Sequence, residues 1–596
     1  MKKYIFSLLF CFILCASAQA IPEAEFIKIT KDYTFQPDGS YEIRYTKQLK
    51  INTHIAFNNL YGETFIVYNP NYQSIKINSS YTEQADGTII KAPENAFNEV
   101  LPSNAADAPA YNHLRELVIT HTGLEIGATI FLDYTLETKA GYLPNGILPE
   151  TDDLLEEASP VKEYTINIQV PASLPLNYIL TASQVKPKIT EKGNMKQYSW
   201  QFKNIPAASY ESKIPDSVIP RLITSCYDSQ LTALKALYGN YFTDQPDETV
   251  KNKVKELTDG KKDDLEKILA LQQFVAGQIA FCKIPFEQAG YTARTPKEVL
   301  NTAYGTDIEK NRLLASMLRA IGQKPEIVIL FPAQLQNGIK GLNTISSFRI
   351  KANNNGKPLF ISALFYPTPS LELSGHQKNI WMISDAEILP LNIVENNNSV
   401  NYKANIQLSP EKATTNGRFI IKGGMIATMD TASTGKYIKN LCSQAGKLTT
   451  SQLNSADRRN ADMSFSAEKE LSTTHDYLLY ELPHVNTGIK AWYLGILNSS
   501  RKKPFELSYP ITENYSYTIT LTPEMALKTK AANIDISKPF GKLHISITPN
   551  GSQITVNKEI QLNKTVLSPS EYQDFRNMYN IWNDKNYNTL LIQIKQ

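Results

Sequence analysis

The sequence predicts an α+β multidomain protein, with a β-sandwich first, an α+β core in the middle and a β-rich domain last. Apolar and polar residues alternate over much of 21–215 and 391–596, which is the period of strands with one buried face. Between them the apolar residues change to helical spacing before short apolar runs return. At about 150 residues per domain, 596 residues give three or four domains. We therefore place domains at 21–215, 216–390 and 391–596.

Residues 1–20 have the features of a secretory signal peptide. A positively charged start is followed by an apolar run over 4–15, which is too short to span a bilayer because a span needs about 20 apolar residues. Ala18 and Ala20 then form a small-x-small cleavage site. We expect the mature chain to begin near Ile21, to have no transmembrane segment and to be exported to the periplasm or cell envelope.

Composition excludes several classes of protein. The chain has 61 basic and 58 acidic residues, so its charge gives no sign of a nucleic-acid partner or of a basic patch for membrane lipids. It contains no CxxC and no HExxH pattern, and the sequence therefore indicates no metal site and no cofactor.

Three cysteines follow the predicted signal peptide: Cys226, Cys282 and Cys442. Three thiols permit one disulfide at most, so the chain is not a disulfide-stabilised scaffold. Cys226 and Cys282 fall in the same predicted domain and could pair. The sequence is equally compatible with three buried free thiols.

The N-terminal segment contains repeated hairpin signals. Asp38-Gly39 lies between two alternating stretches, and Asp86-Gly87 marks a second turn. Many short strands at even spacing predict a β-sandwich over 21–215.

The central segment contains helices first and strands afterwards. Helical spacing near residues 265–279 is followed by a helix from about Asp307 to Ile321, which Gly322 ends. Apolar strands follow over Glu326–Leu330 and Leu359–Ile361. This order predicts an α+β core.

The C-terminal segment returns to strands. Tyr517, Ile519 and Leu521 alternate with polar residues, and a helix over about Ser570–Trp582 precedes the final strand. The sequence contains no visible internal repeat.

Part of the central segment resembles a known family. The segment 296–330, with Gly305-Thr306-Asp307 before a helix that ends in Leu-Arg-Ala-Ile-Gly322, resembles the nucleophile segment of bacterial transglutaminase-like proteins. In that family a glycine, a small or acidic residue and the catalytic cysteine precede a helix ending in Leu-Arg-Ala-x-Gly. The resemblance implies a papain-like or transglutaminase-like core.

The flanking segments resemble the β-domains of unknown function that surround such cores in Gram-negative envelope proteins. Tyr61-Gly62-Glu63, Tyr68-Asn69-Pro70 and the segment 123–127 carry this resemblance.

The resemblance also assigns positions to a Cys-His-Asp triad. A thiolate at a helix N-terminus attacks an amide, a histidine moves the proton and an aspartate orients the histidine. In this sequence the nucleophile position falls on Asp307, the histidine position on Ser346 or Ser347, and the aspartate position on Ser362. All three are replaced, so the resemblance implies a member that has lost its triad.

The distribution of histidines supports this interpretation independently. None occurs between His121 and His376, so most of the predicted core lacks the side chain that ordinarily shuttles protons near neutral pH. Thr306 and Glu309 form a capping-box pattern, which makes Asp307 favourable in the first turn of a helix.

We therefore expect a non-catalytic exported protein that binds peptide, peptidoglycan or glycan, or that scaffolds an envelope partner. The alternative is a cysteine peptidase or transglutaminase with an unrecognised site, in which a cysteine, a histidine and a carboxylate meet in the fold. A third hypothesis is a glycan-binding module on a β-domain, which an exposed aromatic strip on 21–215 or 391–596 would favour.

Overall fold

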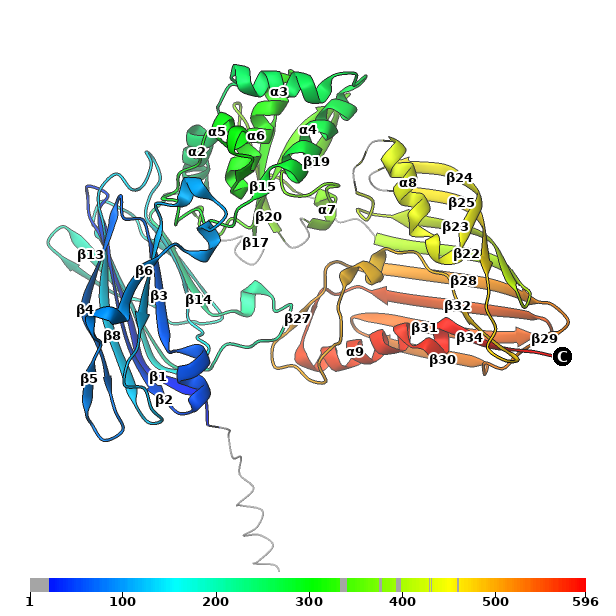
Figure 1. Ribbon diagram of the computed structural model, residues 1–596, viewed down its shortest axis with the longest axis horizontal. Coiled ribbons are helices and arrows are strands. Elements are labelled where there is room, and N and C mark those ends of the chain that lie inside the picture. Colours follow the sequence, from blue (N-terminus) through cyan, green and yellow to red (C-terminus); the bar gives the residue numbers. More distant parts are fainter. Residues whose placement is uncertain are drawn as a thin grey trace, which may run out of the picture. The chain divides into compact units, whose positions relative to one another are not determined.

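The computed structural model describes residues 21–332, 340–374, 378–392, 398–427, 429, 431–457 and 460–595 (Figure 1). The predicted signal peptide at 1–20 and its cleavage site lie outside the described residues. The chain forms two compact units. The first contains the chain up to Ser209 with 220–226 and 284–292, and the second contains 210–219, 227–283 and everything after Thr292.

An eight-stranded sheet dominates the first unit. Its strands, in spatial order, are β12 (Lys188–Lys192), β13 (Met195–Ile205), β10 (Val161–Pro171), β1 (Ala24–Phe35), β2 (Tyr41–Ile51), β8 (Thr129–Thr138), β4 (Gln73–Glu83) and β5 (Ile89–Lys91). Two three-stranded sheets accompany it: β3 (Glu63–Tyr68), β7 (Arg115–Thr120) and β6 (Phe97–Val100), and β11 (Asn177–Thr181), β14 (Arg221–Ser225) and β9 (Glu150–Leu154).

Both turns that the sequence predicts connect antiparallel neighbours. Gly39 joins β1 to β2 and Gly87 joins β4 to β5, and each has a positive φ, 84° and 88°, that favours glycine. The single parallel pairing of the large sheet joins β1 to β10, with Ile29 opposite Tyr164.

The second unit begins with helices and a five-stranded sheet. The helices are α2 (Gln230–Tyr241), α3 (Glu248–Thr258), α4 (Asp264–Gln278), α5 (Pro296–Thr302), α6 (Asp307–Ala320) and α7 (Leu371–Ser374). The sheet has the order β19 (Lys357–Ile361), β18 (Ser347–Asn354), β17 (Glu326–Pro332), β20 (Lys378–Ile383) and β21 (Ile388–Pro390), and all its neighbours are antiparallel.

Helix α6 is the centre of this core. It packs against α3, α4, α5 and β18, and every residue from Ile308 to Leu318 is buried. A short parallel pair, β15 (Ala280–Phe281) and β16 (Tyr304–Gly305), leads into its N-terminus. The predicted order of helices followed by strands is confirmed, and the five-stranded sheet is antiparallel.

A second eight-stranded sheet dominates the C-terminal part. Its strands, in spatial order, are β24 (Lys447–Asp457), β25 (Asn460–Glu470), β23 (Lys412–Lys422), β22 (Asn398–Leu408), β28 (Ile511–Leu521), β32 (Gln553–Leu562), β31 (Gly541–Asn550) and β30 (Ala532–Lys538). Smaller sheets contain β26 (Tyr477–Glu481), β34 (Thr589–Ile594) and β29 (Met525–Leu527), and β27 (Phe505–Glu506) and β33 (Val566–Leu567). Helices α8 (Thr431–Leu441), α9 (Pro569–Asn583) and α10 (Lys585–Asn588) complete it, and residues of α8 and α9 share one apolar core with the sheet.

The two large sheets have the same topology over seven strands. The spatial order β12-β13-β10-β1-β2-β8-β4 of the first corresponds to β31-β32-β28-β22-β23-β25-β24 of the second. The order along the chain also corresponds, and in both sheets the one parallel pair occupies the same place, β1 with β10 and β22 with β28. The repeat that is invisible in the sequence is therefore present in the fold.

The predicted α+β multidomain fold class, with β-rich ends and a central α+β core, is confirmed. Cys226, Cys282 and Cys442 are all buried and none of them forms a disulfide, so the pairing of Cys226 with Cys282 that the sequence left open does not occur. Among the described residues, no helix combines the length and the apolar character that crossing a membrane requires.

Candidate functional site at the first turn of helix α6

A capping box begins helix α6. The Thr306 side chain accepts a hydrogen bond from the Glu309 amide at 3.4 Å, and the Glu309 carboxylate accepts one from the Thr306 amide at 2.9 Å. These two bonds satisfy backbone donors that a helix N-terminus leaves without partners. The capping box predicted from Thr306 and Glu309 is present, and it fixes where the first turn begins.

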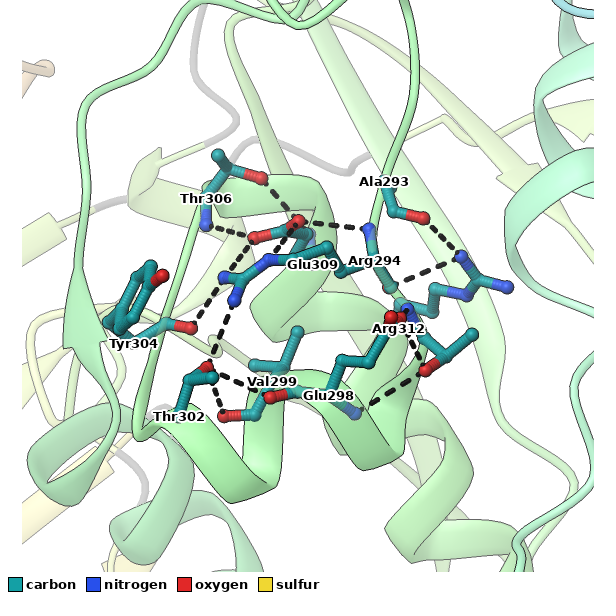
Figure 2. Close-up of polar contacts among 10 residues, drawn as sticks. Ala293, Arg294, Glu298, Val299, Thr302, Tyr304, Thr306, Glu309 and Arg312 are labelled. Atoms are coloured by element: carbon teal, nitrogen blue, oxygen red, sulfur yellow. Dashed lines mark hydrogen bonds and ion pairs between the residues drawn. The ribbon is translucent and has the colours of Figure 1, made fainter. Parts of the chain in front are cut away.

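Glu309 also joins the helix to the segment before it (Figure 2). Its carboxylate accepts bonds from the Arg294 amide, Nε and Nη2, each at 2.9 Å. The Arg294 guanidinium lies over the Tyr304 ring, 4.4 Å from its centroid. Burial alone would raise the pKa of Glu309, but the bonds and charge of Arg294 hold it below its usual value.

A second ion pair holds the same side of the helix. Arg312 pairs with Asp244, with Nη2 2.9 Å from the carboxylate Oδ1, and its Nη1 donates to the Ala293 carbonyl at 2.7 Å. Arg294, Glu309, Arg312 and Asp244 therefore position the first turn and have their charges compensated by one another.

Asp307, at the first position of α6, is in a different environment. Its Oδ1 accepts a hydrogen bond from the Asn311 amide Nδ2 at 2.7 Å, and no described residue forms an ion pair with it. Burial raises the pKa of Asp307 to about 6, while the charges of Arg349 and Lys310 act to lower it. Asp307 is partly buried rather than fully enclosed. It is therefore a partly buried carboxylate that one side-chain amide bonds and that two nearby cations stabilise without a direct ion pair.

Two buried cations lie near this carboxylate. Lys310 donates its Nζ to the Ile279 carbonyl at 2.5 Å, and burial lowers its pKa to about 8. Arg349 of β18 donates Nη1 to the Phe348 carbonyl at 2.7 Å, and its Nε has no hydrogen-bond partner among the described residues. The Asn311 Oδ1 and the Gln272 Oε1 are likewise buried without partners in this part of the chain.

The serines that the resemblance placed in the triad have structural roles. The Ser346 amide donates to the Leu330 carbonyl at 2.8 Å, and Ser347 begins β18 opposite Leu330. The Ser362 Oγ, just after β19, accepts bonds from the Leu364 and Phe365 amides at 3.0 and 3.2 Å. Among the described residues, no hydrogen bond or ion pair connects any of these serines to Asp307.

The sequence analysis missed Arg349. It lies two residues beyond Ser347 on β18, and its charge is the first of those that act on Asp307. A sequence signal existed, since Arg349 is the one charged residue of the stretch from Ile345 to Ile350. A single charged residue within such a stretch indicates that the cation is buried and that a compensating group lies nearby.

Cys282 lies next to the same turn. Its amide donates to the Gly305 carbonyl at 3.1 Å, which places it beside the strand that leads into α6, and its thiol acts electrostatically on Lys310. No imidazole is present in the described part of the core, and His376 lies outside the described residues. The described residues also contain no group of three or more side chains suited to a metal ion.

Family models match three segments of the chain. The transglutaminase-like superfamily model matches residues 251–348, which include the first turn of α6. Two domains of unknown function with solved structures match on either side, DUF3857 over 37–209 and DUF3858 over 477–592.

Solved structures also match this chain, to very different extents. A crystal structure of a putative protease from Parabacteroides distasonis ATCC 8503 has 34% identity and a TM-score of 0.75, and the match covers 96% of this chain and 99% of that one. A putative cysteine protease from Cytophaga hutchinsonii has 10% identity and a TM-score of 0.19, covering 41% of this chain and 90% of that one. An M1 zinc metallopeptidase from Deinococcus radiodurans has 13% identity and a TM-score of 0.17, covering 43% and 52%.

None of the curated proteins matches the sequence. The Parabacteroides structure is aligned over nearly the whole of both chains, and the three family models occur in the order that the sequence resemblance implies. This protein therefore belongs to the transglutaminase-like superfamily, in a form whose core is preceded by DUF3857 and followed by DUF3858.

Proposed function

We propose that this protein is exported to the cell envelope, does not catalyse amide chemistry, and uses its altered core to bind a peptide, peptidoglycan or glycan group or to scaffold a partner. The observation that carries the proposal is Asp307. At the helix N-terminus where the family places a thiolate, a carboxylate is held by the Asn311 amide, and the described residues of the core contain no imidazole. A carboxylate there keeps the negative charge that the helix dipole favours without the reactivity of a thiolate.

Amide cleavage also requires a proton for the leaving amine. Histidine supplies it in cysteine hydrolases, and the core sequence has none before His376. Lys310 and Arg349 are buried, and each donates one hydrogen bond to a carbonyl oxygen. The groups around Asp307 are therefore suited to binding, with the carboxylate as acceptor for a ligand that carries N–H groups.

The pKa of Asp307 makes this binding testable by pH. A carboxylate with a pKa of about 6 is ionised at pH 7.5 and largely neutral at pH 5. Binding of a cationic or amide group should therefore weaken as pH falls through 6. The probe is a set of soluble peptidoglycan fragments, with the affinity measured by calorimetry for the chain from residue 21 onward.

Asp307→Asn should remove this pH dependence and weaken binding about tenfold, because a hydrogen bond to a charged group contributes about 1.5 kcal/mol. Asp264→Asn is the matched control, since Asp264 also occupies the first position of a helix but is exposed. Equal affinities for the two variants would contradict a role of Asp307 in binding.

The rival function is a cysteine enzyme that uses Cys282. Its position beside Lys310 favours it over Cys226 and Cys442, whose pKa values burial raises to about 12 and about 11. We expect no hydrolysis or transamidation of fluorogenic peptides above background, and no restoration of activity by Asp307→Cys, because triad members act as a unit. Selective alkylation of Cys282 at neutral pH, together with an amidase activity that Cys282→Ala abolishes, would establish the enzyme instead.

Export rests on residues 1–20 alone. Protein recovered from the envelope fraction should begin near Ile21 on N-terminal sequencing. Material that keeps the first twenty residues would contradict the proposed cleavage.

A further inference from the structure

The large C-terminal sheet has one buried face and one open face. Along β22, Tyr402, Ala404 and Ile406 are buried while Lys403 and Asn405 between them are exposed. The open face is hollowed into a groove with a volume of about 620 Å³. Its lining contains mainly amide and hydroxyl side chains, and its two charged residues are Lys403 and Arg418.

The groove follows two rows of side chains that cross the strands. The ladder registers place the members of each row opposite one another, on neighbouring strands about 4.8 Å apart. The first row is Gln452, Ser464, Arg418, Lys403, Ser516 and Asn557. The second row is Thr450, Ser466, Asn416, Asn405, Thr518 and Thr555. An extended polar polymer could therefore contact successive strands with the same kinds of groups.

The topologically matched sheet of the N-terminal domain provides an internal reference. On its outer face Arg44 of β2 forms a two-bond ion pair with Asp133 of β8, with distances of 3.0 and 2.6 Å. Asn78 of β4 donates to the same carboxylate at 2.8 Å, next to a bulge.

The same motif occurs at the matched place in the C-terminal sheet. Arg418 of β23 forms a two-bond ion pair with Asp462 of β25, with distances of 2.9 and 2.6 Å. Asn454 of β24 donates to that carboxylate at 3.0 Å, again at a bulge. The two motifs match in residue type, strand and bonding, so they align the outer faces residue by residue.

The aligned faces differ in one charge. In the N-terminal sheet the residue opposite Arg44 is Asp32, and it also accepts a bond from Asn167 at 2.6 Å. In the C-terminal sheet the residue opposite Arg418 is Lys403, which forms no ion pair with any residue that the structure describes. Two like charges directly opposite one another on a sheet are destabilising. Because the N-terminal sheet has Asp32 at the matched position, this sheet topology does not require two cations opposite one another.

We propose that this groove binds an acidic polysaccharide with one carboxylate per sugar, such as a uronate chain. The carboxylate lies between Lys403 and Arg418 and supplies beside Arg418 the negative charge that Asp32 supplies beside Arg44 in the matched domain. The amide and hydroxyl side chains of the two rows bond the sugar hydroxyls. Arg418 already pairs with Asp462, so Lys403 supplies the charge of the groove that no described residue pairs with, and the many neutral polar side chains suit the hydroxyl groups of a sugar chain. Its one aromatic lining residue, Phe465, is buried and offers no ring for stacking on a sugar.

The experiment measures binding of polygalacturonate oligosaccharides to the chain from residue 21 onward by calorimetry. Dextran oligosaccharides are measured for comparison as a neutral glycan, and poly-glutamate is measured as an acidic peptide. Lys403→Asp recreates the charge pattern of the N-terminal sheet and should abolish measurable binding of the uronate. Lys403→Gln should weaken it about tenfold, because a charged hydrogen bond contributes about 1.5 kcal/mol.

Lys422→Asp is the matched control. Lys422 is exposed on the same strand as Arg418 and on the same face, but it does not line the groove. We expect it to leave uronate affinity within about twofold, since a distant surface charge is largely screened by salt. Equal losses for Lys403→Asp and Lys422→Asp, no binding of uronate to the unaltered chain, or equal affinity for poly-glutamate would each overturn the proposal.

Discussion

The N-terminal and C-terminal β-domains have the same sheet topology but bury charge in different ways. In the first, Lys31 on the inner face of β1 pairs directly with Asp153 at 2.8 Å, and the Tyr33 hydroxyl donates to the same oxygen at 2.8 Å. In the second, Glu513 and Lys558 lie on the neighbouring strands β28 and β32 and do not pair directly. The difference shows that a shared topology fixes where strands lie, while the charges inside are satisfied locally.

Glu513 and Lys558 instead each form a hydrogen bond at the end of a helix. Glu513 accepts the amide of Ile489 at 2.6 Å, at the start of the short 3₁₀ helix Gly488–Trp492. Lys558 donates to the Trp582 carbonyl at 3.2 Å near the end of α9. Anions are favourable at helix N-termini and cations at C-termini, so both groups gain from the helices that they hold.

The largest expected effect comes from breaking the direct pair of the N-terminal domain. Asp153→Asn leaves Lys31 without its counter-charge, and we expect the free energy of unfolding of that domain to fall by about 3 kcal/mol. Urea denaturation measures it. Asp133→Asn, on the outer face, is the control and should cost less than about 1 kcal/mol because its partner Arg44 is solvent-exposed. Equal losses of unfolding free energy for the two variants would show that the buried ion pair stabilises the domain no more than the exposed one.

A smaller effect concerns Glu513, whose pKa burial raises to about 7. Because the folded state holds the proton more tightly than the unfolded state, this group contributes stability below its unfolded pKa of about 4.5 that is lost as pH rises through 7. Glu513→Gln should therefore stabilise the C-terminal domain at pH 8 by about 2 kcal/mol and have no such effect at pH 4.5. Denaturation of the unaltered chain and of Glu513→Gln at the two pH values tests this. A variant that is more stable than the unaltered chain at pH 4.5 but not at pH 8 would contradict the expected pH dependence.

Lys558 has the opposite pH dependence. Burial lowers its pKa to about 7. Below pH 7 the buried ammonium therefore lowers the free energy of unfolding, and this loss of stability disappears as pH rises from 7 to the ordinary pKa of 10.5. The combined contribution of the two groups therefore passes through a minimum near pH 7. A double variant, Glu513→Gln with Lys558→Met, should have no such minimum.

The smallest expected effect comes from exchanging the residues that differ between the outer faces of the two large sheets. Asp32→Lys places a second cation opposite Arg44, as Lys403 stands opposite Arg418. We expect it to destabilise the N-terminal domain by about 0.5 kcal/mol, and Lys403→Asp to stabilise the C-terminal domain by a similar amount. Thermal unfolding at low and high salt measures both. If high salt leaves the two differences unchanged, repulsion between the like charges is not their cause.

Local signals in the sequence predicted local structure well. Asp38-Gly39 and Asp86-Gly87 gave correct hairpins, and the Thr306 and Glu309 pattern gave the start of α6 at the residue where it begins. Each of these features depends on residues within about four positions of one another, so sequence spacing alone determines it.

The features that the sequence did not reveal depend on distant residues. The effect of Arg349 on Asp307 requires β18 to pack against α6, and the partnership of Arg294 with Glu309 requires a loop to fold back onto the helix. The match between Lys403 and Asp32 requires the register of two sheets, which no alternation pattern specifies. The candidate site was therefore located by its family motif, while its charge balance required the fold.

The parallel pairing of β22 with β28 has a consequence for how the C-terminal domain matures. Asn398 pairs with Ile511, so the centre of the sheet closes only after the ribosome has made more than one hundred further residues. Until then β22 presents an open edge that can pair with another chain. Crossing a membrane before folding would postpone that risk until the whole domain is present. A chain truncated before β28 should accumulate as aggregates rather than as a smaller folded domain.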